Sequence, residues 1–373
     1  MKVLLIATVQ SHICQFHRPL AEMLHKYGCE IHVAARNNLA EKKGLKLDFA
    51  EKIFDVPFQR TPFSLKNLKA YRALKKIIDN EQYDVVHCNT PVGGVLGRLA
   101  ANSARKKGTR VFYTAHGFHF YKGGPLKNWL FWYPVEKFMC HYTDKLLVIT
   151  QEDYDLAKAK FNVKVFRTHG VGANSSKYHP LPYEECDALR KELGYENNKI
   201  VLCTGELNKN KNQITAIRAI QAITEKIPQV KLLLAGNGSS LPDLKKAVRE
   251  LKLERHVDFL GYQIDLERYV NIADVILSCS LREGLPMNIV EGMLCGKPIV
   301  ASDNRGHREL IENGQNGILV PATNSAAFSL AIQKLLLDPE MSSSFIRMGL
   351  SKGRFYCDIA IKKELQNIYE YRH

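Results

Sequence analysis

The sequence predicts an α/β protein with two doubly wound domains that face a cleft. Short apolar, β-branched runs alternate with longer amphipathic segments along the whole chain, which is the pattern of parallel strands joined by crossover helices. The alternation stops at a Gly-, Asn- and Ser-rich stretch, residues 170–176, and then starts again. The runs are apolar throughout, as in sheets covered by helices on both faces. We therefore predict one domain at residues 1–170 and a second at residues 171–355.

In the first domain each expected strand is a short run rich in Val, Ile or Leu, and each expected helix is a longer amphipathic segment. The expected strands are Val3–Thr8, Ile31–Ala35, Asp84–Cys88, Arg110–Ala115, Leu146–Thr150 and Val163–Thr168. The expected helices are Phe16–Tyr27, Leu65–Asn80, Val92–Lys107, Trp129–Tyr142 and Gln151–Phe161.

The second domain repeats the pattern. A glycine turn and the helix Gln213–Ile227 follow its first strand, and the chain ends in an expected helix, Ala360–Tyr371, with no strand after it. The expected strands are Ile200–Thr204, Lys231–Ala235, Val257–Leu260, Val275–Ser280, Ile299–Ser302 and Ile318–Val320.

The composition is that of a soluble globular protein. The 373 residues suffice for two domains with large cores, and 45% of them are apolar and 24% charged. No apolar run reaches the roughly 18–20 residues that a membrane-spanning helix needs. The nine cysteines are scattered singly, with no C-x-x-C spacing. This favours reduced thiols in a cytoplasmic protein over a disulfide framework or a zinc site.

The positive charge is concentrated in the first half of the chain. Residues 1–170 hold 27 Lys and Arg against 14 Asp and Glu, a net charge of +13, whereas residues 171–373 hold 26 against 24, a net charge of +2. A basic half suits an anionic surface or substrate. Nucleic acid is the rival partner, but no helix-turn-helix, RNP or zinc-finger signature accompanies the charge, so we expect no nucleic-acid binding.

The most informative segment lies in the second domain, directly after the strand that ends at Ser280. Glu283 and Glu291 stand eight residues apart across a Gly-Leu-Pro turn, and Glu291 falls inside a new helix. Such a turn exposes backbone N–H groups at a helix start, where a diphosphate binds. The segment reads Arg282, Glu283, Gly284, Leu285, Pro286, Met287, Asn288, Ile289, Val290, Glu291.

Glycine turns follow other strands of this domain. Gly205 and Glu206 open a loop that runs to Lys211 and then into a helix, a position that faces phosphates in doubly wound sheets. The run Gly236–Gly238, with Asn237 at its centre, is a weak dinucleotide signal because the third glycine is missing. Tyr262 follows the next strand.

The first domain places His116 and Gly117 at the end of a buried-looking strand, at the edge where such sheets bind ligands. The candidate acceptor side consists of the loop after the first strand together with Tyr121 and Lys122, which follow His116 in the chain. These acceptor-side candidates are His12, Phe16, His17, Arg18, Tyr121 and Lys122.

Both tryptophans fall between Tyr121 and Tyr133, interleaved with Lys122, Lys127 and Lys137. Two interpretations stay open: a face at the membrane interface, or a helix whose stripe of Trp129, Trp132 and Val135 packs into the core. No metal site is expected, since the Asp153-x-Asp155 run lies on an amphipathic helix.

Residues 199–321, with the stretches Tyr113–Trp129 and Ser302–Leu310, resemble retaining glycosyltransferases of family 4, which have the GT-B fold of two Rossmann-like domains. Phe58–Phe63 and His87–Gly94 narrow the resemblance to bacterial capsule and exopolysaccharide enzymes of the second-sugar type. It implies that the last helix, within residues 356–373, packs back on the first domain.

The resemblance also implies a reaction. An N-acetylhexosamine would pass from a UDP-sugar to an undecaprenyl-diphosphate-linked sugar with retention of configuration and without a metal cofactor. The departing phosphate oxygen would accept the proton of the acceptor hydroxyl. The enzyme would be cytoplasmic and peripheral on the inner face of an anionic membrane.

Roles for single residues follow from the same resemblance. His116, Glu283 and Lys211 would be catalytic: His116 beside the donor sugar, Glu283 on its hydroxyls and Lys211 on the leaving diphosphate. Glu291 would bind the ribose. The other donor-site residues would be Gly205, Glu206, Gly236, Asn237, Tyr262, Arg282, Gly284, Leu285, Met287 and Asn288.

Glu206 departs from the family pattern, because an Arg is usual there. It either replaces a phosphate ligand or serves a geometry specific to this subfamily. Two other classes of function stay open: a sugar-nucleotide epimerase of the same fold, which needs no acceptor, and a non-catalytic polysaccharide- or membrane-binding protein.

Overall fold

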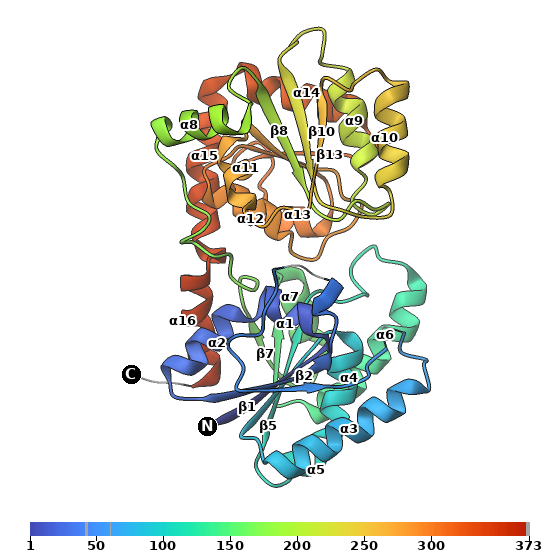
Figure 1. The fold of residues 1–373 in the computed structure, drawn as a ribbon. Helices are drawn as coiled ribbons and strands as arrows, with labels where there is room; N and C mark the ends of the chain where they lie inside the picture. The colour runs from blue at the N-terminus through green and yellow to red at the C-terminus, as the bar shows by residue number, and fades with distance from the viewer. Residues whose placement is uncertain (42–43, 60, 371–373) are drawn as a thin grey trace. The chain divides into compact units, whose positions relative to one another are not determined.

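The structure, a computed structural model, describes residues 1–41, 44–59 and 61–370 (Figure 1). It divides into two compact units, one formed by Met1–Gly172 with Asp358–His373 and the other by Ala173–Cys357. Each unit contains one sheet whose strands all pair in parallel. The predicted α/β class with two parallel sheets is therefore confirmed.

The first unit has a seven-stranded sheet in the order β3-β2-β1-β4-β5-β6-β7. Alternate residues of β1 enter two different cores, with Leu4 and Ile6 on one face and Val3 and Leu5 on the other. The sheet is thus covered on both faces, as its continuous apolar strands predict. The strands are β1 (Lys2–Val9), β2 (Glu30–Arg36), β3 (Lys52–Asp55), β4 (Val85–Asn89), β5 (Arg110–Ala115), β6 (Lys145–Val148) and β7 (Lys164–Arg167).

Helices cover both faces of this sheet in Figure 1. They are α1 (Gln10–Phe16), α2 (Arg18–Lys26), α3 (Lys66–Glu81), α4 (Pro91–Ala100), α5 (Asn102–Arg105), α6 (Leu126–Met139), α7 (Gln151–Lys160) and α16 (Asp358–Tyr369).

The second unit has a six-stranded sheet in the order β10-β9-β8-β11-β12-β13. Its strands are β8 (Lys199–Thr204), β9 (Val230–Ala235), β10 (Val257–Gly261), β11 (Val275–Ser278), β12 (Ile299–Ser302) and β13 (Ile318–Val320). Its helices are α8 (Tyr183–Leu193), α9 (Gln213–Gln221), α10 (Leu241–Glu250), α11 (Leu266–Ile272), α12 (Met287–Leu294), α13 (Arg305–Leu310), α14 (Ser325–Leu337) and α15 (Pro339–Gly353).

Some predicted elements were wrong. The strand β3 was missed because it is a short edge strand with exposed charged ends, so no apolar run marks it. The helix expected at Phe16–Tyr27 is two helices, and α1 already starts at Gln10. His12 therefore lies on a helix, where a loop was expected. The helix expected at Val92–Lys107 is likewise divided, between α4 and α5.

The last helix, α16, belongs to the first unit and lies beside α2 (Figure 1). Ile361, Leu365 and Ile368 are buried in the same core as β1. The Tyr369 hydroxyl hydrogen-bonds Nδ1 of His87 at 2.6 Å, and the Lys145 ammonium donates to the Ile368 carbonyl at 2.6 Å. The end of the expected helix at Tyr371 lies outside the described residues, as does Arg60 of the Phe58–Phe63 stretch.

One side of α6 packs against the core and the other side is exposed, so each of the two interpretations of the aromatic segment fits one side of the helix. Trp129, Trp132 and Tyr133 pack against the core of the first unit, and the Trp129 indole donates to the Tyr121 carbonyl at 3.1 Å. The opposite side of the helix is apolar as well but exposed. This exposed side consists of Leu126, Leu130, Phe131, Val135 and Phe138. In the part of the chain that is described, no helix combines the length and apolar character needed to cross a bilayer.

Candidate active site

The candidate donor residues of the second unit gather where the strand order of its sheet reverses. The strands β9 and β11 lie on opposite sides of β8, so the loops after β8 and β11 leave the sheet side by side. The Lys211 ammonium, on the first loop, donates to Oε1 of Glu283, on the second, at 2.6 Å. Both side chains are partly buried, and water therefore screens the ion pair less than one on an open surface.

Two further hydrogen bonds join the same two loops. The Leu281 N–H donates to the Asn210 carbonyl at 2.7 Å, and the side-chain amide of Asn210 donates to the Arg282 carbonyl at 3.0 Å. The Lys211–Glu283 pair is thus held by a fixed frame. This contact joins residues 72 positions apart in the sequence.

Glycines allow the turns after β8 and β9 to stack directly on each other. A Cβ at Gly236 would lie 2.0 Å from the Gly205 carbonyl oxygen, and one at Gly238 would lie 2.2 Å from that of Leu207. Both distances are far below van der Waals contact, so only glycine fits. The Leu207 N–H donates to the Asn237 carbonyl at 3.0 Å and joins the two turns. These glycines serve loop packing.

The helix α12 begins beside this frame without a side-chain cap, because Pro286 precedes it. The N–H groups of Met287 and Asn288 are therefore available to an anion, whereas that of Ile289 donates to the Pro286 carbonyl at 3.1 Å. Nδ2 of Asn288 is buried and finds no hydrogen-bond acceptor among the described residues. A buried amide of this kind suits a ligand oxygen.

The turn that carries Glu283 packs against the start of α13. A Cβ at Gly306 would lie 2.6 Å from the Gly284 carbonyl oxygen and 2.7 Å from Cβ of Glu283. Asn304 caps α13 by accepting from the N–H groups of Gly306 and His307 at 3.0 and 3.1 Å. Gly306 therefore sets the position of Glu283.

Glu291 lies further along α12 and is partly buried. Burial raises the pKa of its carboxyl to about 7, although the Lys177 charge and a hydrogen bond from Tyr178 lower it. At neutral pH the group is therefore divided between its acid and its carboxylate. A ligand that donates hydrogen bonds would favour the carboxylate.

The remaining donor candidates lie on the surface of the second unit. Glu206, Arg282 and Tyr262 are exposed, and Leu285 and Met287 are partly buried. No hydrogen bond or ion pair among the described residues involves the Glu206 side chain, and its carbonyl accepts from the Gln213 amide at 3.0 Å.

In the first unit the structure brings three histidines together where β1, β4 and β5 end. Nε2 of His12 lies 3.2 Å from Nε2 of His116, and the His17 ring centre is 5.6 Å from that of His116. Phe16 packs its ring against His12 at 4.9 Å. Nε2 of His116 also lies 3.4 Å from Oδ1 of Asn89, a buried residue of the His87–Gly94 stretch that was not among the candidate site residues. Its place at the end of β4 was the available signal.

Burial keeps these imidazoles neutral. It lowers the pKa of His116 to about 4 and holds the pKa values of His12 and His17 well below their ordinary value, with a further lowering from neighbouring histidines. Neutral imidazoles both donate and accept hydrogen bonds, which suits sugar hydroxyls.

The same cluster could hold a transition metal, because one ring nitrogen from each of His12, His17 and His116 lies within 4.8 Å of the other two. Nε2 of His17 is buried with no hydrogen-bond partner in the described chain. Metal independence therefore stays a prediction. Asp153, in contrast, accepts from the Phe118 N–H at 3.2 Å and holds the loop after β5.

Other acceptor-side candidates do not join the cluster. Arg18 pairs with Asp48 at 2.6 Å and lies over the Phe49 ring. Tyr121 and Lys122 lie in the loop between β5 and α6, where the Lys122 N–H donates to Glu152 at 3.1 Å and its side chain is exposed.

The protein has two α/β units with parallel sheets, and each has turns suited to ligand binding at the ends of its strands. This is the architecture of GT-B enzymes. A model of the family described as glycosyl transferases group 1 matches residues 187–351, and one described as glycosyl transferase 4-like matches residues 2–150. The putative glycosyltransferase EpsD of Bacillus subtilis is 42% identical over 99% of this chain and 96% of its own length.

An Escherichia coli enzyme, UDP-Gal:alpha-D-GlcNAc-diphosphoundecaprenol alpha-1,3-galactosyltransferase, is 28% identical over 78% of this chain and 76% of its own length. The crystal structure of Anabaena HepE in complex with UDP covers all of both chains, with a TM-score of 0.80 and 21% identity. This chain belongs to the group 1 glycosyltransferases of family 4, which confirms the predicted family and the GT-B fold.

Proposed function

We propose that this chain is a retaining glycosyltransferase that transfers a sugar from a UDP donor to a sugar on undecaprenyl diphosphate, in capsule or exopolysaccharide assembly. N-acetylhexosamine is the donor sugar we propose. The Lys211–Glu283 pair beside the uncapped start of α12 carries the proposal. It is supported by the E. coli relative, which is named for a diphosphoundecaprenol acceptor, and by HepE, which was solved with UDP.

In this proposal the second unit holds the donor. The α12 N–H groups and Lys211 bind the diphosphate and stabilise its charge as it leaves. The donor sugar takes Glu283 as a hydrogen-bond acceptor, so that Lys211 is shared between Glu283 and the phosphate. Glu291 accepts hydrogen bonds from the ribose hydroxyls, which favour its ionised form.

The first unit takes the acceptor. The neutral pair of His116 and His12 offers a hydrogen-bond donor and an acceptor to sugar hydroxyls at the ends of β1 and β5, His116 to those of the donor sugar, as the family resemblance implies, and His12 to those of the acceptor. Asn89 positions the His116 ring. The departing phosphate oxygen accepts the proton of the attacking hydroxyl, so no histidine needs to ionise.

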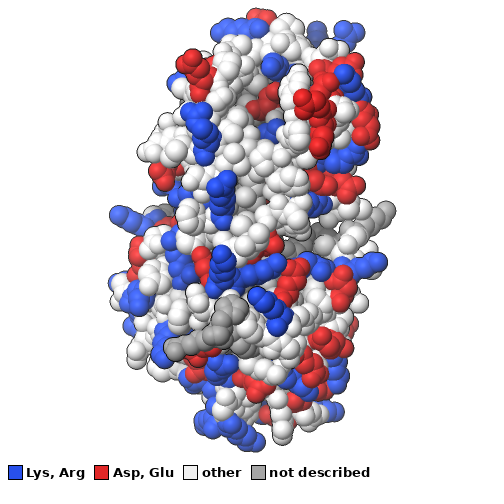
Figure 2. Space-filling model, turned by 90° about the vertical axis from the view of Figure 1, so that its left-hand side faces the viewer, with Lys and Arg blue, Asp and Glu red and all other residues white. Residues whose placement is uncertain are grey.

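The first unit also meets an anionic membrane, because its net charge is strongly positive and the outer side of α6 is apolar. The face drawn in Figure 2 carries Lys and Arg interspersed with Asp and Glu, so the surplus is not one patch on that face. Lys127 and Lys137, in contrast, flank the exposed apolar side chains of α6.

The test is an incubation of the purified chain with a panel of radiolabelled UDP-sugars and a short-chain lipid-linked acceptor. We expect transfer from one UDP-sugar, retention of the anomeric configuration by NMR, and unchanged rates in a chelator. Release of an altered UDP-sugar without acceptor would establish an epimerase instead. UDP binding without turnover would establish a binding protein.

A further inference from the structure

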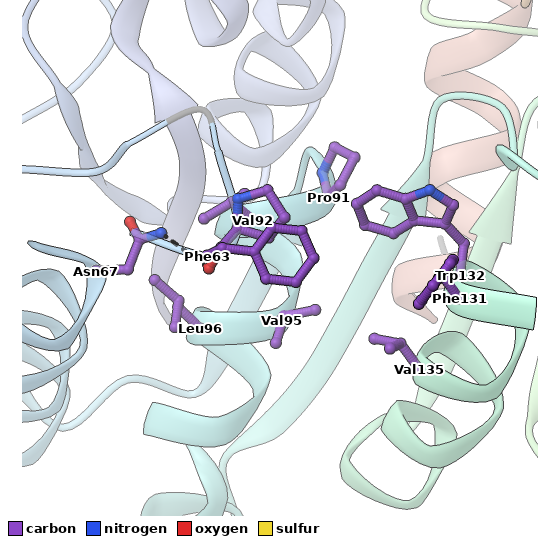
Figure 3. Close-up of a pocket in the computed structure, with 10 residues that line it drawn as sticks. Phe63, Asn67, Pro91, Val92, Val95, Leu96, Phe131, Trp132 and Val135 are labelled. Atoms are coloured by element: carbon purple, nitrogen blue, oxygen red, sulfur yellow. Dashed lines mark hydrogen bonds between the residues drawn. The ribbon is translucent and has the colours of Figure 1, made fainter. Parts of the chain in front are cut away.

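The first unit contains an apolar groove that the candidate active site does not explain. Its volume is about 280 Å³, and its walls come from α4, α6 and the turn before α3 (Figure 3). Asn67 is the one amide side chain in the lining, and both ends of that amide are occupied: it accepts from the Gln59 N–H at 3.0 Å and donates to the Thr61 carbonyl at 2.9 Å. The groove therefore suits a hydrocarbon and not a sugar or a nucleotide.

The groove is a fixed feature because a buried ion pair joins its two helical walls. The Arg98 guanidinium on α4 donates to the Glu136 carboxylate on α6 at 2.9 Å and lies 3.9 Å from the centre of the Tyr113 ring. The Tyr113 hydroxyl reaches the same carboxylate at 3.3 Å. A satisfied buried network of this kind holds α4 and α6 at a set spacing.

The outer rim of the groove is apolar and open to solvent. Phe63 is 88% exposed and Phe131 is 68% exposed. In Figure 3 these two rings and Val95 border the hollow, with Trp132 and Val135 on the α6 side. Exposed aromatic rings gathered around a concave apolar surface mark a binding site for an apolar partner.

Both walls of the groove are continuous in the chain with segments that contain or contact the histidine cluster. Pro91 and Val92 in its lining open α4 two and three residues after Asn89, the residue in contact with His116. On the other wall the Trp132 ring stacks on His119 at 5.0 Å, three residues after His116. Both walls thus lead back to the ends of β4 and β5.

We propose that this groove binds the first isoprene units of the lipid-linked acceptor, next to the diphosphate. This inference rests on the proposed function, because it places the sugar of the acceptor at the histidine cluster. A flat bilayer surface would cover the exposed rim but would not fill a concave slot. The elements that form the groove also carry positive charge, which suits an anionic lipid-linked acceptor. The exposed Lys66 and Lys69 lie on α3 beside Asn67 in the sequence, and the exposed Lys127 lies four residues before Phe131 on α6.

The test compares two acceptors in the absence of membranes, a sugar diphosphate with a short prenyl chain and one with a methyl group in its place. The variant is Phe63→Ser with Phe131→Ser, both at exposed positions whose loss leaves the core intact. The matched control is Leu126→Ser, which removes a 74% exposed apolar side chain from the same helix outside the groove.

We expect the parent and the control to prefer the prenyl acceptor. The double variant should lose this preference through a KM for the prenyl acceptor raised on the order of tenfold, since contact with two aromatic rings is lost. Its KM for the UDP-sugar should not change. An undiminished preference in the double variant would overturn the inference. So would a variant that binds vesicles less but keeps the preference, because the groove would then serve the bilayer.

A binding assay separates this inference from the proposed function. Farnesyl diphosphate should shift the fluorescence of Trp132, and the shift should be absent in Trp132→Phe and weakened in the double variant. If no acceptor is glycosylated but this shift is observed, the proposed function fails and the groove remains a prenyl site. If transfer occurs and farnesyl diphosphate causes no shift, the groove inference fails alone.

Discussion

Replacing Glu291 by Gln should stabilise the protein and weaken its donor binding at the same time. The fold raises the pKa of this carboxyl from 4.5 to about 7. A raised pKa means that the folded state prefers the protonated form. Stability from this group is therefore fully present below about pH 4.5 and is lost as the pH rises through about 7.

The magnitude follows from that shift. A rise of the pKa from 4.5 to about 7 corresponds to about 3 kcal/mol, at about 1.4 kcal/mol for each pKa unit. The side chain is only partly buried, so solvent screening reduces this value, and we expect about 1–3 kcal/mol. Because Gln is neutral at every pH, Glu291→Gln should raise the free energy of unfolding by this amount at about pH 8. At about pH 5 most of the gain should disappear.

Donor binding should change in the opposite direction. Ribose hydroxyls that donate to a carboxylate lose about 1.5–3 kcal/mol when the acceptor is a neutral amide, which corresponds to a ten- to hundredfold weaker Kd for UDP. For the same reason the parent should bind UDP less tightly as the pH falls below about 7.

Urea unfolding of the ligand-free protein at both pH values and calorimetry with UDP measure the two effects. Glu254→Gln, at an exposed position of the same unit, is the control and should change neither. An unchanged UDP affinity in Glu291→Gln would reject the ribose role. A lower stability of that variant at about pH 8 would refute the argument from burial.

Three further predictions concern the donor turn and the membrane face. Glu206→Arg should leave the melting temperature unchanged, since the side chain is exposed, and should abolish turnover, because Glu206 serves a geometry specific to this subfamily; full activity with tighter UDP binding would show that it replaces a phosphate ligand instead. Gly306→Ala should displace Glu283, since a Cβ at this position meets the Gly284 carbonyl. The variant should therefore have a kcat reduced on the order of a hundredfold, with a small change in UDP affinity, and a wild-type kcat would contradict the tight packing. Lys122→Glu with Lys127→Glu should reduce binding to anionic vesicles at low salt by about 1 kcal/mol per residue, with little effect on a short-chain acceptor; equal binding of the parent to neutral vesicles would refute the electrostatic role.

The sequence allowed the two sheets to be predicted because their strands are buried on both faces. Val201, Leu202 and their neighbours in β8 form an unbroken apolar run, and a run of this kind identifies a parallel strand without further information. The edge strand β3 has no such signature, since Lys52 and Asp55 lie at its exposed ends. Solvent on one side of an edge strand removes the constraint that makes its neighbours recognisable.

The candidate site was only partly predictable for a different reason. Lys211 and Glu283 were each identified by their own turns, but their contact depends on β8 lying next to β11, which the sequence alone does not state. His12 was expected in a loop and lies on α1, because a short helix with several polar residues gives little periodic signal. The groove was missed since Phe63 and Phe131 are exposed, and composition does not distinguish an exposed aromatic from a core one.

The place of α16 has a consequence for how the chain is made. The first unit is synthesised first, yet Ile361, Leu365 and Tyr369 of its core leave the ribosome only after the second unit. At about 5–20 residues per second, translation of the intervening unit takes on the order of ten to forty seconds. During that time the apolar surface that α16 covers is open to water, so the nascent chain should recruit a chaperone there. A chain truncated after Cys357 should accumulate as aggregate even though its second unit is whole.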